Sequence, residues 1–108
     1  MTFLVSLAVL LGAVHGVVTR GPTAPVCRVG MPCDEPAVGV QLVFSRGGKA
    51  IGFTRTAAGG RYSIVLPAGT YTITQRPAAK IGGLRPIQVK VVGGTSRRLD
   101  LFIDTGIR

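Results

Sequence analysis

The sequence predicts an all-β protein, a seven-stranded β-sandwich with Greek-key crossings, from three observations. Short stretches of alternating apolar and polar residues recur, and Gly or Pro interrupts them about every ten residues. The clearest stretch, residues 62–66, lies between Gly59-Gly60 and Pro67-Ala68-Gly69, which favour tight turns. Beyond residue 14, no stretch repeats its apolar residues with the period of a helix.

Residues 3–14 (FLVSLAVLLGAV) form an uncharged apolar run followed by small residues, which is typical of a signal peptide. We expect a signal peptide over residues 1–13, cleaved after Ala13, and one domain over residues 14–108. Met1-Thr2 lack the usual Lys or Arg, so an uncleaved anchor is the alternative, although the run only reaches the lower limit of a membrane span, about 17 residues. The expected location is secreted or at the cell surface.

Residues 16–20 predict the first strand of the domain. A loop over residues 21–36 follows, with four Pro and both cysteines, Cys27 and Cys33. In an oxidising compartment such a pair is most simply a disulfide that ties a long loop. A zinc site would need further Cys or His ligands, and the five residues between the cysteines exclude a CxxC redox motif.

Residues 40–44 predict the second strand and residues 51–53 the third, with Ile51 and Phe53 facing the core. Arg46-Gly47-Gly48 predicts the hairpin turn between them. Residues 62–66 and 70–74 predict the fourth and fifth strands, with both tyrosines of the chain facing inward. Tyr71 follows a corner, so its ring is expected in the core and its hydroxyl on the upstream backbone, as in the tyrosine corner of Greek-key sandwiches.

A second loop covers residues 76–86. Residues 87–91 and 98–103 then predict the last two strands, joined by a turn at Gly93-Gly94. In the final strand the alternation places Leu99, Leu101 and Ile103 in the core and leaves Phe102 exposed.

The pattern Thr56-x-x-x-Gly60-Arg61-Tyr62, followed by LPAGTY at residues 66–71, resembles the carboxypeptidase regulatory-like domain, a transthyretin-like (prealbumin-like) β-sandwich. Gly16-Val17-Val18 is similar to the first-strand motif of that family, so the resemblance covers residues 15–104. The resemblance implies a transthyretin-like sandwich that stands alone as a small exported bacterial protein. It implies accessory or structural roles and no enzymatic activity.

The chain carries 13 Lys and Arg against 4 Asp and Glu, a formal net charge of +9. This balance favours anionic partners, although a biased codon supply would also explain a chain rich in Arg and without Asn. If consecutive strands alternate in direction, one end of the sandwich gathers a set of basic side chains. These candidate anion-binding residues are Arg28, Arg55, Arg61, Arg76, Lys80, Arg85 and Arg108.

Catalytic chemistry has little support in the sequence. The one histidine, His15, adjoins the expected cleavage site, and no base is predicted near Ser45, Ser63 or Ser96. We therefore expect no enzyme, no metal site and no cofactor, and rank a hydrolase third.

The first expectation is an exported structural or interaction module, and the alternative is a basic protein that binds polyanions or the cell wall. The candidate partners are a surface or extracellular protein and an anionic wall polymer. Specific nucleic-acid binding is not expected, and membrane contact is expected only if the N-terminal segment is retained.

Overall fold

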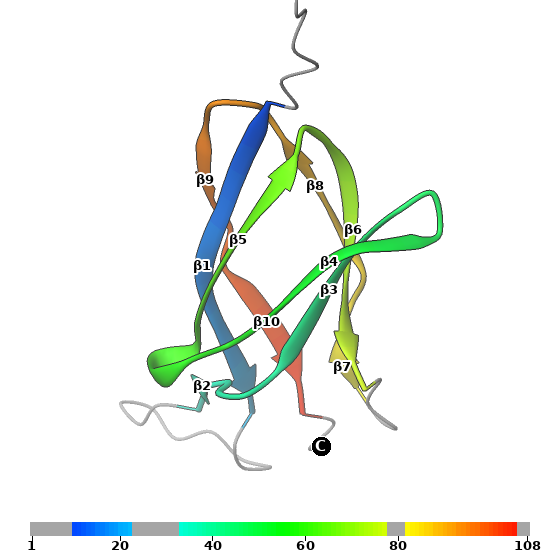
Figure 1. Cartoon of the computed structure of the whole chain (residues 1–108). Helices are drawn as coiled ribbons and strands as arrows, with labels where there is room; N and C mark the ends of the chain where they lie inside the picture. The colour runs from blue at the N-terminus through cyan, green and yellow to red at the C-terminus, as the bar shows by residue number, and fades with distance from the viewer. Residues whose placement is uncertain (1–9, 23–32, 78–81, 106–108) are drawn as a thin grey trace, which may run out of the picture.

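The structure is a computed structural model, and it describes residues 10–22, 33–77 and 82–105. Its strands form two sheets that pack face to face, which confirms the predicted all-β sandwich (Figure 1). The elements, in chain order, are β1 (Leu11–Gly21), β2 (Glu35–Pro36), β3 (Gln41–Arg46), β4 (Lys49–Arg55), the single 3₁₀ turn η1 (Ala58–Gly60), β5 (Arg61–Pro67), β6 (Gly69–Arg76), β7 (Gly83–Leu84), β8 (Ile87–Val91), β9 (Ser96–Arg98) and β10 (Leu101–Asp104). Within the described residues, no helix is long and apolar enough to cross a membrane.

The seven predicted strands correspond to β1, β3, β4, β5, β6, β8 and the pair β9–β10. The two additional segments, β2 and β7, are each two residues long and lie in the predicted loops. The predicted last strand is divided because the backbone at Leu99 and Asp100 leaves the ladder between β9 and β10.

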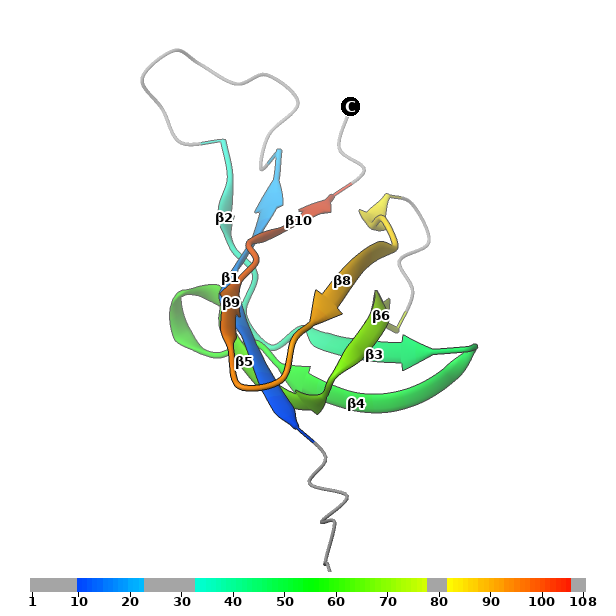
Figure 2. The same ribbon diagram turned by 90° about the horizontal axis from the view of Figure 1, so that it is seen from above.

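The first sheet is organised around β1, which at 11 residues is long enough to pair with two strands on each side. On one side it pairs antiparallel with β5 and then with β2. On the other side it pairs parallel with β9 and then with β10, and β7 continues the sheet beyond β10. Figure 1 shows β1 between β9 and β5, and Figure 2 shows β1 and β9 apart from β3, β6 and β8 of the other sheet. Nearly the whole length of β1 is therefore held from both sides.

The second sheet has the order β4-β3-β6-β8, and all of its pairs are antiparallel. The turn η1 carries the chain from β4 in this sheet to β5 in the first sheet. As a result β4 and β5 lie beside each other at one flank of the sandwich, where the Thr54 hydroxyl donates a 3.1 Å hydrogen bond to the Ser63 carbonyl oxygen.

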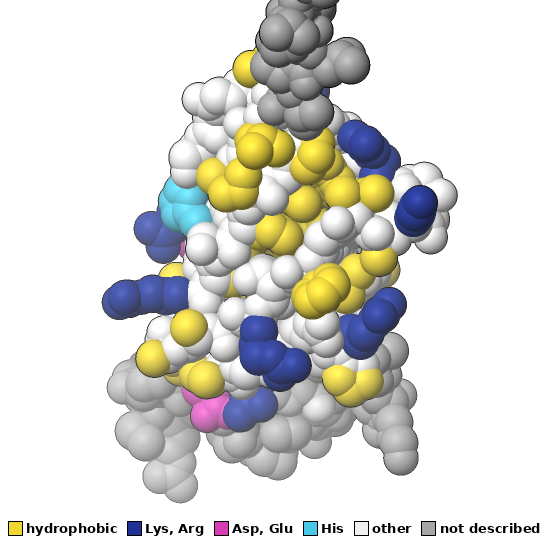
Figure 3. Space-filling model, viewed as in Figure 1, with side chains coloured by type: hydrophobic (Ala, Val, Ile, Leu, Met, Phe, Trp, Pro, Cys, Tyr) yellow, Lys and Arg dark blue, Asp and Glu magenta, His cyan; other side chains and the backbone are white. Residues whose placement is uncertain are grey.

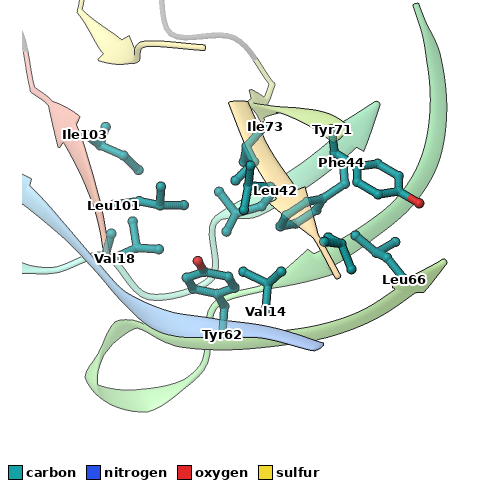
Figure 4. Close-up of a cluster of buried hydrophobic side chains, with 13 residues drawn as sticks. Val14, Val18, Leu42, Phe44, Tyr62, Leu66, Tyr71, Ile73, Leu101 and Ile103 are labelled. Carbon is teal, nitrogen blue, oxygen red and sulfur yellow. The ribbon is translucent and has the colours of Figure 1, made fainter. Parts of the chain in front are cut away.

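Side chains from both sheets meet in a common apolar interior (Figure 4). Burial of such side chains is the main favourable contribution to folding. The buried set is Val14, Val18, Ala37, Leu42, Phe44, Tyr62, Leu66, Tyr71, Ile73, Val89, Val91, Leu101 and Ile103. The inward prediction for both tyrosines is confirmed, because Tyr71 is 0% exposed and Tyr62 is 4% exposed.

The tyrosine corner is confirmed as well. The Tyr71 hydroxyl donates a hydrogen bond of 2.5 Å to the carbonyl oxygen of Pro67, four residues upstream. A second polar anchor is Thr56, which is buried. Its hydroxyl accepts from the Val40 amide at 2.9 Å and donates to the Ala37 carbonyl oxygen at 2.5 Å. These two hydroxyls connect the turns of the sandwich to its core.

The first strand begins earlier than the sequence predicts, at Leu11 instead of Gly16. Leu11–Ala13, the last three residues of the expected signal peptide, pair with residues 65–67 of β5. The added length follows from alternation, since Gly12 and Val14 continue the buried face of Gly16 and Val18. Cleavage after Ala13 would fall inside β1, and the signal peptide stays a prediction.

The prediction that Ile51 and Phe53 face the core is wrong. Phe53 is 68% exposed and Ile51 is 38% exposed. Gly52 faces inward instead, because Ile64 and Leu66 of β5 occupy the space in front of it: a Cβ on Gly52 would lie 2.9 Å from Leu66 Cδ2. Gly52 of β4 therefore faces the interior, and the large apolar residues Ile51 and Phe53 face solvent.

The predicted disulfide joins Cys33 to Cys27, which lies outside the described residues. The pairing therefore stays a prediction. The expected exposure of Phe102 is confirmed, at 49%.

Candidate basic site on the β5–β1–β9 face

A hollow of about 650 Å³ lies at the flank where β4 turns through η1 into β5. Its walls come from the consecutive strands β4 and β5 and from β1 and β9, which are distant from them in the sequence. The lining residues are His15, Gly16, Val17, Thr54, Arg55, Ala57, Arg61, Tyr62, Ser63 and Arg98. The hollow is thus a product of the tertiary fold.

Strand register brings the polar residues of the hollow together. His15 of β1 is the direct partner of Ser63 in β5 and also of Arg98 in β9. Residues that pair directly across strands point their side chains to the same face of the sheet. Ser63, His15 and Arg98 therefore form a row across three strands, and all three are exposed. Arg61, which pairs with Val17, extends the set along β5.

The backbone between β9 and β10 changes its hydrogen bonding beside this row. Gly16 permits a close approach there, since a Cβ at this position would lie 2.1 Å from the Leu99 carbonyl oxygen. That oxygen accepts a hydrogen bond from the Tyr62 hydroxyl. The Val17 amide donates instead to Oδ1 of Asp100, at 3.0 Å. A side-chain carboxylate thus takes the place of a backbone acceptor in the ladder.

Two titratable groups beside the hollow are shifted. The hydrogen bond from the Val17 amide, followed by the one from Arg98 Nε at 3.3 Å, lowers the pKa of the Asp100 carboxyl. Burial raises the pKa of Tyr62 to about 12, and the nearby Asp100 carboxylate adds to the rise. Asp100 therefore stays ionised and Tyr62 stays neutral near pH 7.

The hollow carries excess positive charge. Three guanidinium groups line it (Arg55, Arg61 and Arg98), and Asp100 beside it supplies one carboxylate, which leaves three minus one, or +2. Arg55 donates from Nη1 to the Gly39 carbonyl oxygen at 2.8 Å, an uncharged acceptor that leaves its charge in place. In the space-filling view the His side chain and several Lys and Arg side chains lie along the left margin and lower half of the molecule (Figure 3).

One contact contradicts the expectation that the serines have no base nearby: Ser96 Oγ lies 3.1 Å from Nδ1 of His15. Both side chains are exposed, and within the described residues no carboxylate forms a hydrogen bond with His15. A nucleophilic triad needs such a third group to orient the imidazole. The arrangement is better suited to holding an anion, because its side chains supply mostly donors and positive charge.

The structure brings together two of the predicted basic residues in the hollow, Arg55 and Arg61. Arg76, the last residue of β6, and Arg85, which follows β7, do not line the hollow. Arg76 pairs with Gln41, which pairs on its other side with Arg55. The remaining predicted residues, Arg28, Lys80 and Arg108, lie outside the described residues.

Sequence reasoning missed His15, Ser63 and Arg98 as site residues. His15 and Arg98 are 83 positions apart and meet only because β1 and β9 run parallel as neighbours. The alternation within each strand does place each residue on a solvent face. It does not indicate which strands are adjacent, so no local signal joins the three residues.

No family model matches the sequence, and no curated protein matches it. Similar folds occur among solved structures. A minor pilin of the Gram-positive pathogen Streptococcus agalactiae aligns with a TM-score of 0.57 and 12% identity over 87% of this chain. A DUF3823 family protein from Parabacteroides merdae aligns with a TM-score of 0.56 and 17% identity over 86% of this chain. The chain spans less than half of each, 44% and 45%, and at these identities the likeness shows the β-sandwich fold alone.

Proposed function

We propose that the chain is an exported, non-enzymatic β-sandwich module with a structural or interaction role at the cell surface or outside the cell. The observation that carries this proposal is the composition of the interior. Among the described residues the buried side chains are apolar apart from the hydroxyls of Thr56, Tyr62 and Tyr71, and each of these hydroxyls is bonded to the backbone. No buried side-chain N or O atom in the described part lacks a hydrogen-bond partner. These polar groups therefore hold the backbone in place, which favours a structural role.

Two further observations support the same role. One similar structure is a pilin, a class of protein that works at the cell surface. The resemblance of residues 56–71 to the carboxypeptidase regulatory-like domain also favours an accessory module, because such domains are mostly parts of exported proteins.

The test is the fate of the full chain in a secreting bacterial host. We expect it in the extracellular or surface fraction, without residues 1–13, and with Cys27 and Cys33 blocked to alkylation until reductant is added. The measurements are fractionation and intact mass with and without reductant. A cytosolic chain with two freely alkylated thiols would contradict the proposal.

A second candidate function is the binding of anionic polymers through the basic end of the sandwich. The net charge of +9 supports it, as does the placement of Arg55, Arg61 and Arg76 at one end. Binding of this kind releases counter-ions and weakens steeply as salt rises. The chain should therefore bind an anionic matrix at low salt and elute as salt increases.

Two variants with equal net charge distinguish binding through the basic end from binding through net charge alone. The first reverses Arg55, Arg61 and Arg76 to Glu. The control reverses Lys49, Lys90 and Arg97, which are exposed and lie on the β3–β4 hairpin, β8 and β9. Each variant changes the charge from +9 to +3. We expect the first to elute at clearly lower salt than the control, whereas equal shifts would contradict a localised binding surface.

A further inference from the structure

We propose that the hollow between β4, β5, β1 and β9 is a binding site for a phosphate group carried on a sugar or polyol. The inference rests on the second proposed function and adds to it a defined site and ligand. It begins from the chemistry of the walls. Arg55 and Arg61 approach from the β4–β5 side and Arg98 from the β9 side. Between them lie the hydroxyl of Ser63 and the imidazole of His15.

Most of these groups donate hydrogen bonds or carry positive charge. The carboxylate beside the hollow, Asp100, is already engaged through Oδ1 by the Val17 amide and by Arg98 Nε. Arg61, the first residue of β5, takes part in no ion pair within the described residues. If Ser96 donates to Nδ1 of His15, the imidazole Nε2 carries the hydrogen and is available as a donor. The set as a whole complements an oxyanion.

The positions of the donors favour phosphate over carboxylate. Guanidinium groups bind both anions with paired N–H donors. A carboxylate offers two oxygens in one plane, whereas a phosphate monoester offers three oxygens that can be reached from several sides. Here the guanidinium groups stand on two sides of the hollow, Arg55 and Arg61 on the β4–β5 side and Arg98 on the β9 side. Donors that approach from two sides suit the oxygens of a phosphate better than the two oxygens of a planar carboxylate.

The size and the apolar part of the lining indicate what carries the phosphate. A volume of about 650 Å³ is within the range of small-molecule sites and far exceeds the needs of one oxyanion. Val17 and Ala57 also line the hollow and offer apolar surface. Such a surface suits the C–H groups of a sugar or polyol, with the polar walls left for the phosphate.

The test is an NMR titration of the full, isotopically labelled chain at about 150 mM NaCl, a concentration that screens non-specific attraction. The probes are inorganic phosphate, glucose 1-phosphate, glucuronate and methyl glucoside. We expect saturable shifts at the amides of Val17, Arg61 and Ser63 with glucose 1-phosphate, weaker binding of inorganic phosphate and glucuronate, and none of methyl glucoside. Binding of glucuronate as tightly as glucose 1-phosphate would overturn the phosphate assignment.

Two variants that each remove one positive charge test whether binding depends on the hollow. Arg61→Gln removes a charge that lines the hollow, and Arg85→Gln removes the same charge at a residue that does not line it. We expect about a tenfold loss of affinity for glucose 1-phosphate in Arg61→Gln and less than about a twofold loss in Arg85→Gln. Equal losses, or shifts that never saturate, would overturn the site. Retention on an anionic matrix, measured on the same samples, reports separately on polymer binding, and unchanged amide spectra confirm the fold of each variant.

Discussion

Ionisation of Tyr62 is expected to make the protein less stable as the pH rises from about 10 to about 12. The Tyr62 ring is buried between the sheets, and its hydroxyl donates to the Leu99 carbonyl oxygen. Its pKa is about 12 in the folded chain, against about 10 for an unfolded tyrosine. Between these values the unfolded chain has lost the proton and the folded chain still holds it. The stabilising effect is therefore complete below pH 10 and is lost as the pH rises through the folded pKa.

The size of the effect follows from the two pKa values. A difference of about 2 pKa units corresponds to at most about 2.7 kcal/mol. The hydroxyl is only partly buried, so solvent screening reduces this to about 1–2 kcal/mol. We therefore expect the free energy of unfolding of the natural chain to exceed that of Tyr62→Phe by about 1 kcal/mol at pH 8, where the lost hydrogen bond accounts for the difference. This excess should fall by about 1–2 kcal/mol as the pH rises to 12, so that it vanishes or changes sign.

Two measurements check this prediction. Urea unfolding of the natural chain and of Tyr62→Phe at pH 8 to 11.5 gives the difference in the free energy of unfolding, and lysine titration, common to both chains, cancels. In Tyr71→Phe, Tyr62 is the one remaining tyrosine of two. Its absorbance at 295 nm should then titrate near pH 12 in the folded chain and near pH 10 in urea. A folded midpoint near pH 10, or a stability difference that is independent of pH, would refute the reasoning.

Three further substitutions test the anchors of the fold by urea unfolding. Thr56→Val removes the hydroxyl that accepts from the Val40 amide and donates to the Ala37 carbonyl oxygen, and it should lower the free energy of unfolding by about 2–3 kcal/mol. Thr56→Ser keeps the hydroxyl and should lower it by under about 1 kcal/mol. Equal losses would exclude the hydroxyl as the cause. Gly60→Ala puts a Cβ 2.3 Å from the Val18 carbonyl oxygen at a residue with φ +75°, so it should lower the free energy of unfolding by well over about 2 kcal/mol. Gly59→Ala has the same φ but its nearest contact is at 3.7 Å, so it should lower that free energy by about 1 kcal/mol. Similar losses in the two variants would refute the close approach at Gly60. Tyr71→Phe should cost about 1 kcal/mol through its bond to the Pro67 carbonyl oxygen, and no measurable loss would argue against the corner.

The strand faces that could be predicted are those for which the local alternation allowed only one inward face. Residues 62–66 alternate between turns that close on both sides, and in the structure Tyr62 and Leu66 are buried as expected. In β4 the alternation was ambiguous, because either Ile51 and Phe53 or Gly52 and Thr54 could face inward. The larger residues were the natural choice. The packing of β5 against Gly52 decided the opposite.

The candidate site, too, was predictable only in part from the sequence. The sequence indicated that one end of the sandwich would be basic, and Arg55 and Arg61 do meet there. It could not indicate that His15 and Arg98 complete the hollow, because both lie on exposed positions of strands that pair across 83 residues. Nor could it indicate that the exposed Asp100 carboxylate would replace a backbone acceptor for the Val17 amide.

The sequence by itself determined the all-β class, the turns, the inward tyrosines and the excess of positive charge, since period-two alternation, Gly and Pro geometry and net charge are local or additive properties. Only the tertiary structure decided which face β4 turns inward, where the first strand begins and which polar residues share a hollow. Those outcomes depend on which strands become neighbours. Which strands become neighbours depends on how the whole interior packs; at Gly52, for example, the Leu66 side chain occupies the space that a side chain there would need.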